Sequence, residues 1–176
     1  MSDRLDYMNP IGNNLAYVMA VEKLVDLDVP ARAQALRVIL TELQRINSHL
    51  VWLGTSGLDL AAQSLFLYCF REREEILDIF ELVSGQRMMT TYLRPGGLWR
   101  DVPVEFEKAV RVFVNMFHKR VDEYEGLLTK NPLFIDRMVG IGKLTLADAL
   151  SYGITGPMLR ASGSDWDLRK KRPYMG

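Results

Sequence analysis

Two charged residues interrupt an otherwise apolar helical stripe, and buried charges of this kind can do chemistry. The stripe covers residues 65–83 and consists of Leu, Phe, Cys, Ile and Val, with Glu72 and Arg73 in the gap. One explanation is structural: the helix rotates to expose both side chains, or Glu72 pairs with Arg37 or Arg45. The other is a carboxylate held inside a helical bundle near a charge-coupled site.

Single residues elsewhere carry weaker signals. Tyr7 ends the stretch "DRLDY" and is compatible with ordinary aromatic packing near a chain end, while Asp59 closes the stretch "GTSGLD" and is well placed to cap a following helix. Neither His49 nor His118 has a second His or Cys three or four residues away, so the sequence predicts no metal site. The glycines of "GIGKL" do not follow a predicted strand, which excludes a phosphate-binding loop.

Composition narrows the possible partners. Lysine plus arginine and aspartate plus glutamate number 22 each, so no overall charge favours nucleic acid or an anionic membrane surface. The single cysteine, Cys69, excludes an intrachain disulfide and any cysteine-ligated iron–sulfur site contained in this chain, and it indicates a reducing compartment. The apolar run 60–70 is too short to span a bilayer, and residues 1–20 do not resemble a signal peptide.

Helical periodicity dominates the first three quarters of the chain. Apolar spacing predicts helices over 13–27, 31–53, 60–83 and 104–128, the last with heptad-like spacing from Phe106 to Leu128. We expect a turn at 54–59 and, because of its Pro-Gly-Gly, an irregular connector at 92–103. The pattern predicts a mainly all-α fold, specifically an antiparallel four-helix bundle.

The last part of the sequence has a weaker pattern. Residues 145–153 predict a short helix with Thr145 as N-cap, Asp148 at the third position and Gly153 as stop. We expect the glycine-containing stretch from residue 153 onward to be loop. The predicted organisation is a helical core over 1–130 and short helices and loops over 131–176 that pack on it, within one domain.

Several stretches, taken in order, resemble one family. They are "DRLDY" at 3–7, "PARAQALRVILTELQRINSHLVWLGT" at 30–55, "FREREEILDIFELVSGQRM" at 70–88, "YLRPGG" at 92–97 and "LRASGSDWDLRKKRPY" at 159–174. Together they are similar to the quinone-site subunit of respiratory complex I, also called the 49-kilodalton-type or D subunit of NADH-quinone oxidoreductase. Family members are more than twice this length, so the sequence resembles a central fragment.

The resemblance implies roles for particular residues. It implies that Tyr7 hydrogen-bonds one quinone carbonyl, while a histidine on chain outside this sequence binds the other. Asp59 matches the aspartate that pairs with that histidine, and Thr55 matches a position lining the quinone cavity. Glu72, Arg73 and Glu74 are candidates for carrying charge changes toward the membrane arm.

The resemblance also implies partners and a location. Quinone is the expected substrate, and electrons are expected from an iron–sulfur cluster held by a neighbouring subunit, with no cofactor or metal bound by this chain. Other expected partners are peripheral-arm subunits and the membrane-arm subunit at the cavity entrance, on the cytoplasmic side of the cell membrane. The family shares its fold with the large subunit of nickel–iron hydrogenases, whose metal-binding cysteines are not matched here.

Two other interpretations stay open. The chain could be a non-catalytic helical scaffold, or part of a hydrogenase-like membrane complex. Under the complex I interpretation, the isolated fragment is expected to be inactive in NADH:quinone oxidoreduction. We also expect it to self-associate through apolar surface that other subunits would cover.

Overall fold

The computed structural model describes residues 1–175 and divides the chain into two units, Met1–Asn131 and Pro132–Gly176. The predicted segment 131–176 therefore ends on a residue, Gly176, that lies outside the described residues. The prediction of a mainly helical chain is confirmed. The first unit contains the short 3-10 helix η1 (Ser2–Arg4) and the helices α1 (Pro10–Val25), α2 (Ala31–Asp59), α3 (Gln63–Ser84) and α4 (Glu105–Leu127), with strands β1 (Leu93–Arg94) and β2 (Gly97–Leu98) between α3 and α4.

Helix α1 begins three residues before the predicted helix. The Asn9 side chain accepts a hydrogen bond from the Gly12 N–H at 3.2 Å, and Pro10 occupies the first helical position. Proline is well tolerated there because its missing N–H would have no partner within the helix. The stretch "PIG", which precedes the predicted helix, is thus its first turn.

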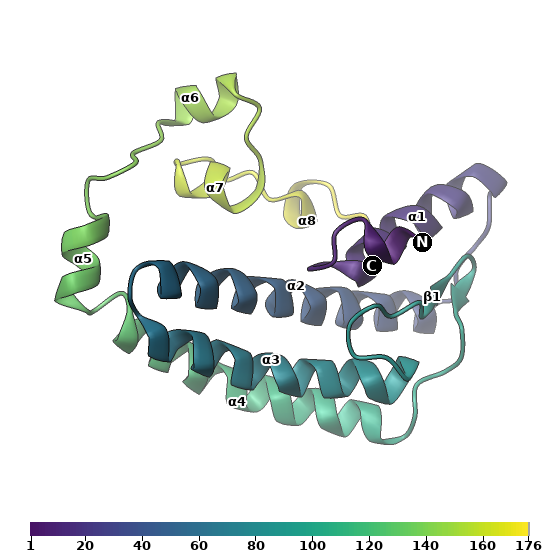
Figure 1. The fold of residues 1–176 in the computed structure, drawn as a ribbon. Helices are drawn as coiled ribbons and strands as arrows, with labels where there is room; N and C mark the ends of the chain where they lie inside the picture. Colours follow the sequence, from purple (N-terminus) through teal and green to yellow (C-terminus); the bar gives the residue numbers. More distant parts are fainter. Residues whose placement is uncertain (176) are drawn as a thin grey trace. The chain divides into compact units, whose positions relative to one another are not determined.

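The expected turn at 54–59 is wrong, because α2 continues through Asp59 and the connection to α3 is only Leu60–Ala62. The two glycines of this stretch face α3 rather than forming a turn. A Cβ atom on Gly54 would lie 3.3 Å from Cys69 Cβ, and one on Gly57 would lie 2.7 Å from Leu65 Cδ2. These glycines allow α2 and α3 to approach closely as they run side by side in opposite directions (Figure 1).

The connector at 92–103 also differs from the prediction, because it contains a two-residue antiparallel ladder. Leu93 pairs with Leu98 and Arg94 with Gly97. Gly96 and Gly97 have φ values of 84° and 156°, which side-chain-bearing residues rarely adopt. The Pro-Gly-Gly sequence therefore makes the turn of a small hairpin.

A buried ion pair ties this hairpin to α1 and α2. Arg37 Nη2 lies 2.6 Å from Glu22 Oε1, and both side chains are almost fully buried. The same guanidinium donates to the carbonyls of Arg94 at 2.8 Å and Gly97 at 2.9 Å, and Glu22 accepts from the Gly96 N–H at 2.8 Å. One carboxylate and one guanidinium thus connect three segments that are distant in sequence.

Helix α4 lies beside α3 (Figure 1) and uses only part of its predicted seam in the described fold. Phe106, Phe113, Tyr124 and Leu128 are buried, whereas Val121 remains 37% exposed. Val110 and Phe117 are intermediate. None of the helices within residues 1–175 is both long and apolar enough to cross a membrane.

The second unit contains short helices: α5 (Pro132–Met138), α6 (Leu146–Ser151), α7 (Gly156–Ala161) and α8 (Leu168–Lys171). Thr145 caps α6 as predicted, because its hydroxyl accepts from the Asp148 N–H at 3.2 Å. The expectation of loop beyond residue 153 is wrong for α7 and α8. Helix α8 begins after Asp167, whose side chain accepts from the Arg169 N–H at 3.0 Å, a cap that we did not predict.

Because α2 and α3 approach closely at Gly54, a larger side chain there should destabilise the fold more than one at Gly126 of α4. Gly54→Val should lower the free energy of unfolding by about 1–3 kcal/mol, because the added atoms overlap α3. Gly126→Val is the matched control, since nothing lies within 4 Å of a Cβ atom at that helical glycine. Urea denaturation of both variants checks this, and equal losses of stability would contradict the packing role of Gly54.

The Glu22–Arg37 pair predicts a specific pH dependence. The hydrogen bond from Arg37 holds the pKa of Glu22 below its ordinary value of 4.5. The pair therefore stabilises the fold fully above pH 4.5, and this contribution is lost as the pH falls through the lowered pKa of the folded state. Glu22→Gln should cost roughly 3 kcal/mol at neutral pH, with the difference from the original chain shrinking in acid.

Denaturant titrations at several pH values measure this effect. Asp101→Asn is the control, because Asp101 pairs with Arg32 at the surface, where water screens the interaction. A Glu22→Gln variant that follows the original chain at every pH would show that the buried pair does not stabilise the fold.

Candidate functional site

Tyr7 lies at the centre of a tight turn that is anchored on α2. Asp6 accepts from the Met8 N–H through its carboxylate at 3.0 Å, and its carbonyl accepts from the Asn13 side chain at 2.9 Å. The Met8 carbonyl accepts from Gln44 Nε2 at 2.9 Å and from Ser48 Oγ at 2.5 Å. Tyr7 itself is 65% exposed, and none of the described residues hydrogen-bonds its hydroxyl.

Gln44 and Ser48 belong to a longitudinal stripe of α2 that also contains Thr55 and Asp59. The spacings of four, seven and four residues keep these side chains on one side of a helix that turns about 100° per residue. The segment around Met8 covers the stripe at Gln44, which is buried, whereas Thr55 and Asp59 are exposed. The stripe is therefore covered at one end and open at the other.

The open end carries polar groups with different local roles. The Thr55 hydroxyl donates to the Val51 carbonyl at 2.8 Å, within its own helix. Asp59 is the last residue of α2, and the residue that precedes α3 is Ala62, so the expected cap of α3 by Asp59 is wrong. No hydrogen bond or ion pair within residues 1–175 engages the exposed Asp59 carboxylate.

The separation along α2 limits what these residues can do together. Asp59 follows the Ser48 anchor by about three helical turns, which corresponds to roughly 16 Å along the helix axis. A direct hydrogen bond between Tyr7 and Asp59 does not fit this separation. The arrangement instead suits one wall of an elongated site, with a phenol donor at one end and a carboxylate at the other.

A second polar cluster is buried between α3 and α4, at Glu72. This carboxylate is fully buried and accepts a short hydrogen bond from the Tyr124 hydroxyl. Arg71 Nε donates to it at 2.5 Å, and Arg120 Nε lies 3.3 Å away. Of the alternatives given for Glu72, exposure is wrong and burial inside the helical unit is correct. Glu72 does pair with arginines, but these are Arg71 and Arg120 of α3 and α4 and not Arg37 or Arg45.

Burial shifts the pKa values of neighbouring groups in the direction expected for a low-dielectric region. It raises the pKa of the Tyr124 hydroxyl, with the Glu72 hydrogen bond as the second cause, so this phenol stays protonated. Burial also raises the pKa of Glu75, with the negative charge of Glu72 adding to the effect. The pKa of Cys69 rises to about 11 for the same reasons, which leaves a neutral thiol.

The other two charge-coupling candidates lie apart from this cluster. Arg73 is buried, its guanidinium lies 5.5 Å from the Phe70 ring centre, and its Nε has no hydrogen-bond partner in the described part of the chain. Burial lowers its pKa. Glu74 is exposed and pairs with Arg87. Glu72, Arg73 and Glu74 are therefore consecutive in sequence but do not form one site.

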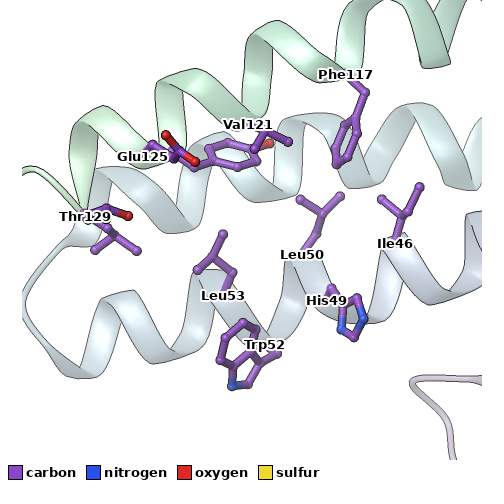
Figure 2. A pocket seen from close by; sticks show the side chains of 11 residues that line it. Ile46, His49, Leu50, Trp52, Leu53, Phe117, Val121, Glu125 and Thr129 are labelled. Carbon is purple, nitrogen blue, oxygen red and sulfur yellow. The ribbon is translucent and has the colours of Figure 1, made fainter. Parts of the chain in front are cut away.

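Tyr124 also borders an apolar pocket of about 280 Å³ between α2 and α4. Figure 2 shows Ile46, Leu50 and Leu53 of α2 pointing toward Phe117 and Val121 of α4. His49, a residue without an assigned role in the sequence, lies at the edge of this pocket.

Sequence reasoning missed Gln44, Ser48 and Tyr124. The first two stand at the i and i+4 positions of a predicted helix, and no local signal shows that both reach the Met8 carbonyl. The sequence places Tyr124 in the apolar seam, although its hydroxyl needs a partner when buried. Within residues 1–175, no group of three His, Cys, Asp or Glu side chains could hold a metal ion.

The family match and the similar proteins point to the same kind of subunit. Residues 59–176 match the family described as respiratory-chain NADH dehydrogenase, 49 Kd subunit. All 176 residues align at 61% identity with a D subunit of NADH-quinone oxidoreductase from Roseiflexus castenholzii and at 54% with the D subunit of NADH-quinone oxidoreductase from Geotalea uraniireducens. The chain spans 42% of the first relative and 45% of the second.

The anchors of the Tyr7 turn predict a local effect of substitution. Ser48→Ala combined with Gln44→Met leaves the Met8 carbonyl without either donor. We expect amide hydrogen exchange of residues 6–9 to accelerate at least about tenfold, while exchange in α3 and α4 is unchanged. Ser48→Thr keeps a hydroxyl and serves as control; unchanged exchange in the double variant would contradict the anchoring role.

Proposed function

Because the chain belongs to the family of the 49 kDa subunit of respiratory-chain NADH dehydrogenase, we propose that it forms one wall of the quinone-reduction site of NADH-quinone oxidoreductase. The relatives' names supply the reaction and the substrate. The observation that carries the proposal is the exposed Tyr7 hydroxyl, held by a turn anchored on α2 and free to bind a ligand.

Tyr7 suits a quinone carbonyl for a chemical reason. Reduction to quinol adds electrons and protons to the quinone oxygens, and the oxygens become more basic as electrons arrive. A positioned O–H group stabilises that change by hydrogen bonding and can transfer its proton to the oxygen. The anchored turn supports this role because it fixes the phenol without occupying its hydroxyl.

Asp59 and Thr55 extend this wall along α2. We assign Asp59 the role of orienting a histidine supplied by chain outside these residues, which would donate to the other quinone oxygen. Its exposed carboxylate, without a partner in the described chain, is available for this pairing. Thr55 lines the cavity between the two ends in this proposal, through its methyl group, since its hydroxyl bonds within α2.

The electron donor must lie on another subunit in this proposal. The single cysteine is buried on α3, with its pKa raised to about 11, and does not fit as a ligand of an iron–sulfur cluster. We therefore assign the cluster to a neighbouring peripheral-arm subunit. The chain would lie peripherally on the cytoplasmic side of the membrane, next to the membrane-arm subunit at the cavity entrance, as part of a proton-translocating enzyme.

Glu72 is the strongest of the three charge-coupling candidates. It is fully buried, and its hydrogen bonds connect α3 to α4, so a change in its charge would act on the packing of both helices. Arg73 and Glu74 have separate surroundings and weaker support. We also propose that the chain shares its fold with the large subunit of nickel–iron hydrogenases. In this proposal its long helices form a four-helix bundle.

The headgroup role of Tyr7 predicts a selective loss of activity. Tyr7→Phe in the complete subunit, assembled into the enzyme, should reduce quinone turnover at least about tenfold because the only lost atom is the hydrogen-bonding oxygen. Reduction of an artificial electron acceptor upstream of the quinone site should be unchanged. Isolated residues 1–176 are expected to be inactive.

Tyr17→Phe is the matched control, because Tyr17 is also exposed and lies on α1. Full quinone turnover by assembled Tyr7→Phe enzyme would refute the headgroup role. It would then favour a non-catalytic scaffold as the function of this chain within the enzyme.

A further inference from the structure

Two separate hollows with mostly apolar walls lie between α2 and α4. One is the pocket of Figure 2, and the other, of about 880 Å³, lies between Leu36 and Ile39 of α2 and Phe106, Val110 and Val114 of α4. Leu43 of α2, which lies between them in sequence, is buried. We call the two hollows together, from Leu36 to Leu53 along α2, the α2/α4 groove. It is distinct from the stripe that carries Ser48, Thr55 and Asp59.

The groove has the residue spacing of a helix-packing seam. On α2, apolar residues follow at spacings of three and four: Leu36, Ile39, Leu43, Ile46, Leu50 and Leu53. This pattern continues over the whole groove, yet several lining side chains remain in contact with solvent. Ile39 is 36% exposed, Val114 is 47% exposed and Val121 is 37% exposed. Such seams normally pack against another helix.

No helix of the first unit is available to fill the groove. Helix α1 is held on the other side of α2 by Arg37, and the turn before it by Gln44 and Ser48. At about 100° per residue, these positions point away from Ile39 and Ile46. Helix α3 already packs against both α2 and α4.

The helices of the second unit are too short. The groove follows α2 from Leu36 to Leu53, or about 25 Å. The longest described helix after α4 is α5, which has seven residues. A matching occupant needs roughly 17 helical residues.

The charges around the groove indicate what kind of helix fits. Arg32 pairs with Asp101 at 3.0 Å and Arg111 pairs with Glu107 at 2.7 Å, so the charges along the wider end neutralise one another. The floor is apolar. An occupant therefore needs an apolar stripe with polar edges and no excess of either charge.

A second copy of the chain fits this groove poorly. In a two-fold symmetric dimer the same surface meets itself, so a groove would face a groove and remain unfilled. The relatives offer a better source, because the chain spans only 42–45% of their length. We infer that the α2/α4 groove is the docking site for a long amphipathic helix from the part of the family's polypeptide outside these 176 residues. This inference rests on family membership and not on the quinone site.

Thiol labelling tests whether the groove is covered. Val114→Cys places a reporter in the groove, and Val112→Cys is the matched control on the same helix, because Val112 is 59% exposed and does not line the groove. Native Cys69 adds little background because it is buried and its pKa is raised to about 11. A maleimide should label Val114→Cys at least about tenfold more slowly in the complete subunit than in the 176-residue chain, with Val112→Cys labelled equally in both.

Each other outcome overturns the inference. Equal labelling of Val114→Cys in both proteins would show that the remaining polypeptide leaves the groove open. Protection that appears only after assembly with other subunits would assign the groove to a partner protein. Protection of the 176-residue chain that increases with its concentration would assign the groove to a second copy.

Photocrosslinking then identifies the occupant. A benzophenone amino acid at position 114 of the complete subunit should crosslink within the same polypeptide, to a peptide outside the region equivalent to residues 1–176. That peptide should show apolar residues at helical spacing. A crosslink to a segment without this spacing would overturn the assignment to an amphipathic helix. Because quinone turnover is not the readout, this test can fail or succeed independently of the role of Tyr7.

Discussion

The buried pair between Glu22 and Arg37 is the interaction on which the rest of the first unit depends. It joins α1 to α2, and both partners also bind the backbone of the hairpin at residues 93–98. Buried pairs often add little net stability compared with apolar residues, but removing one partner leaves a costly unpaired charge. Here the pair also ties α1 to α2 and the hairpin, and α1 begins directly after the turn that carries Tyr7, which Gln44 and Ser48 anchor separately.

Because the pair fixes α1 on α2, the two sides of α2 have different surroundings. One side holds α1 and the Tyr7 turn along half of its length, and then presents Thr55 and Asp59 to solvent. The opposite side is an apolar seam that faces α4 and stays partly exposed, as Ile39 shows. Since α1 is fixed on the first side, it cannot cover the second. The proposed quinone wall and the proposed helix-docking groove are therefore two results of one constraint.

Local patterns in the sequence predict the elements better than their contacts. Apolar periodicity locates the long helices, and the predicted Thr145 cap is correct because its signal lies within four residues. The prediction for 54–59 is wrong because its glycines serve the approach of α3, which only the tertiary structure reveals. Glu72 does lie on a buried face, but its partners Arg120 and Tyr124 are about fifty residues away, and no local rule selects them. The candidate roles of Tyr7, Thr55 and Asp59 come from family resemblance, since none of the three has a distinctive local signal.

A double-mutant cycle tests the central claim most directly. The free energies of unfolding of Glu22→Gln, Arg37→Met and the double variant, measured at neutral pH, isolate the coupling between the two side chains. We predict a coupling energy of at least about 2 kcal/mol, with a change in the NMR signal of fluorotyrosine-labelled Tyr7 in both single variants. A coupling energy near zero, with the Tyr7 signal unchanged, would contradict the claim that this pair holds α1, α2 and the hairpin together.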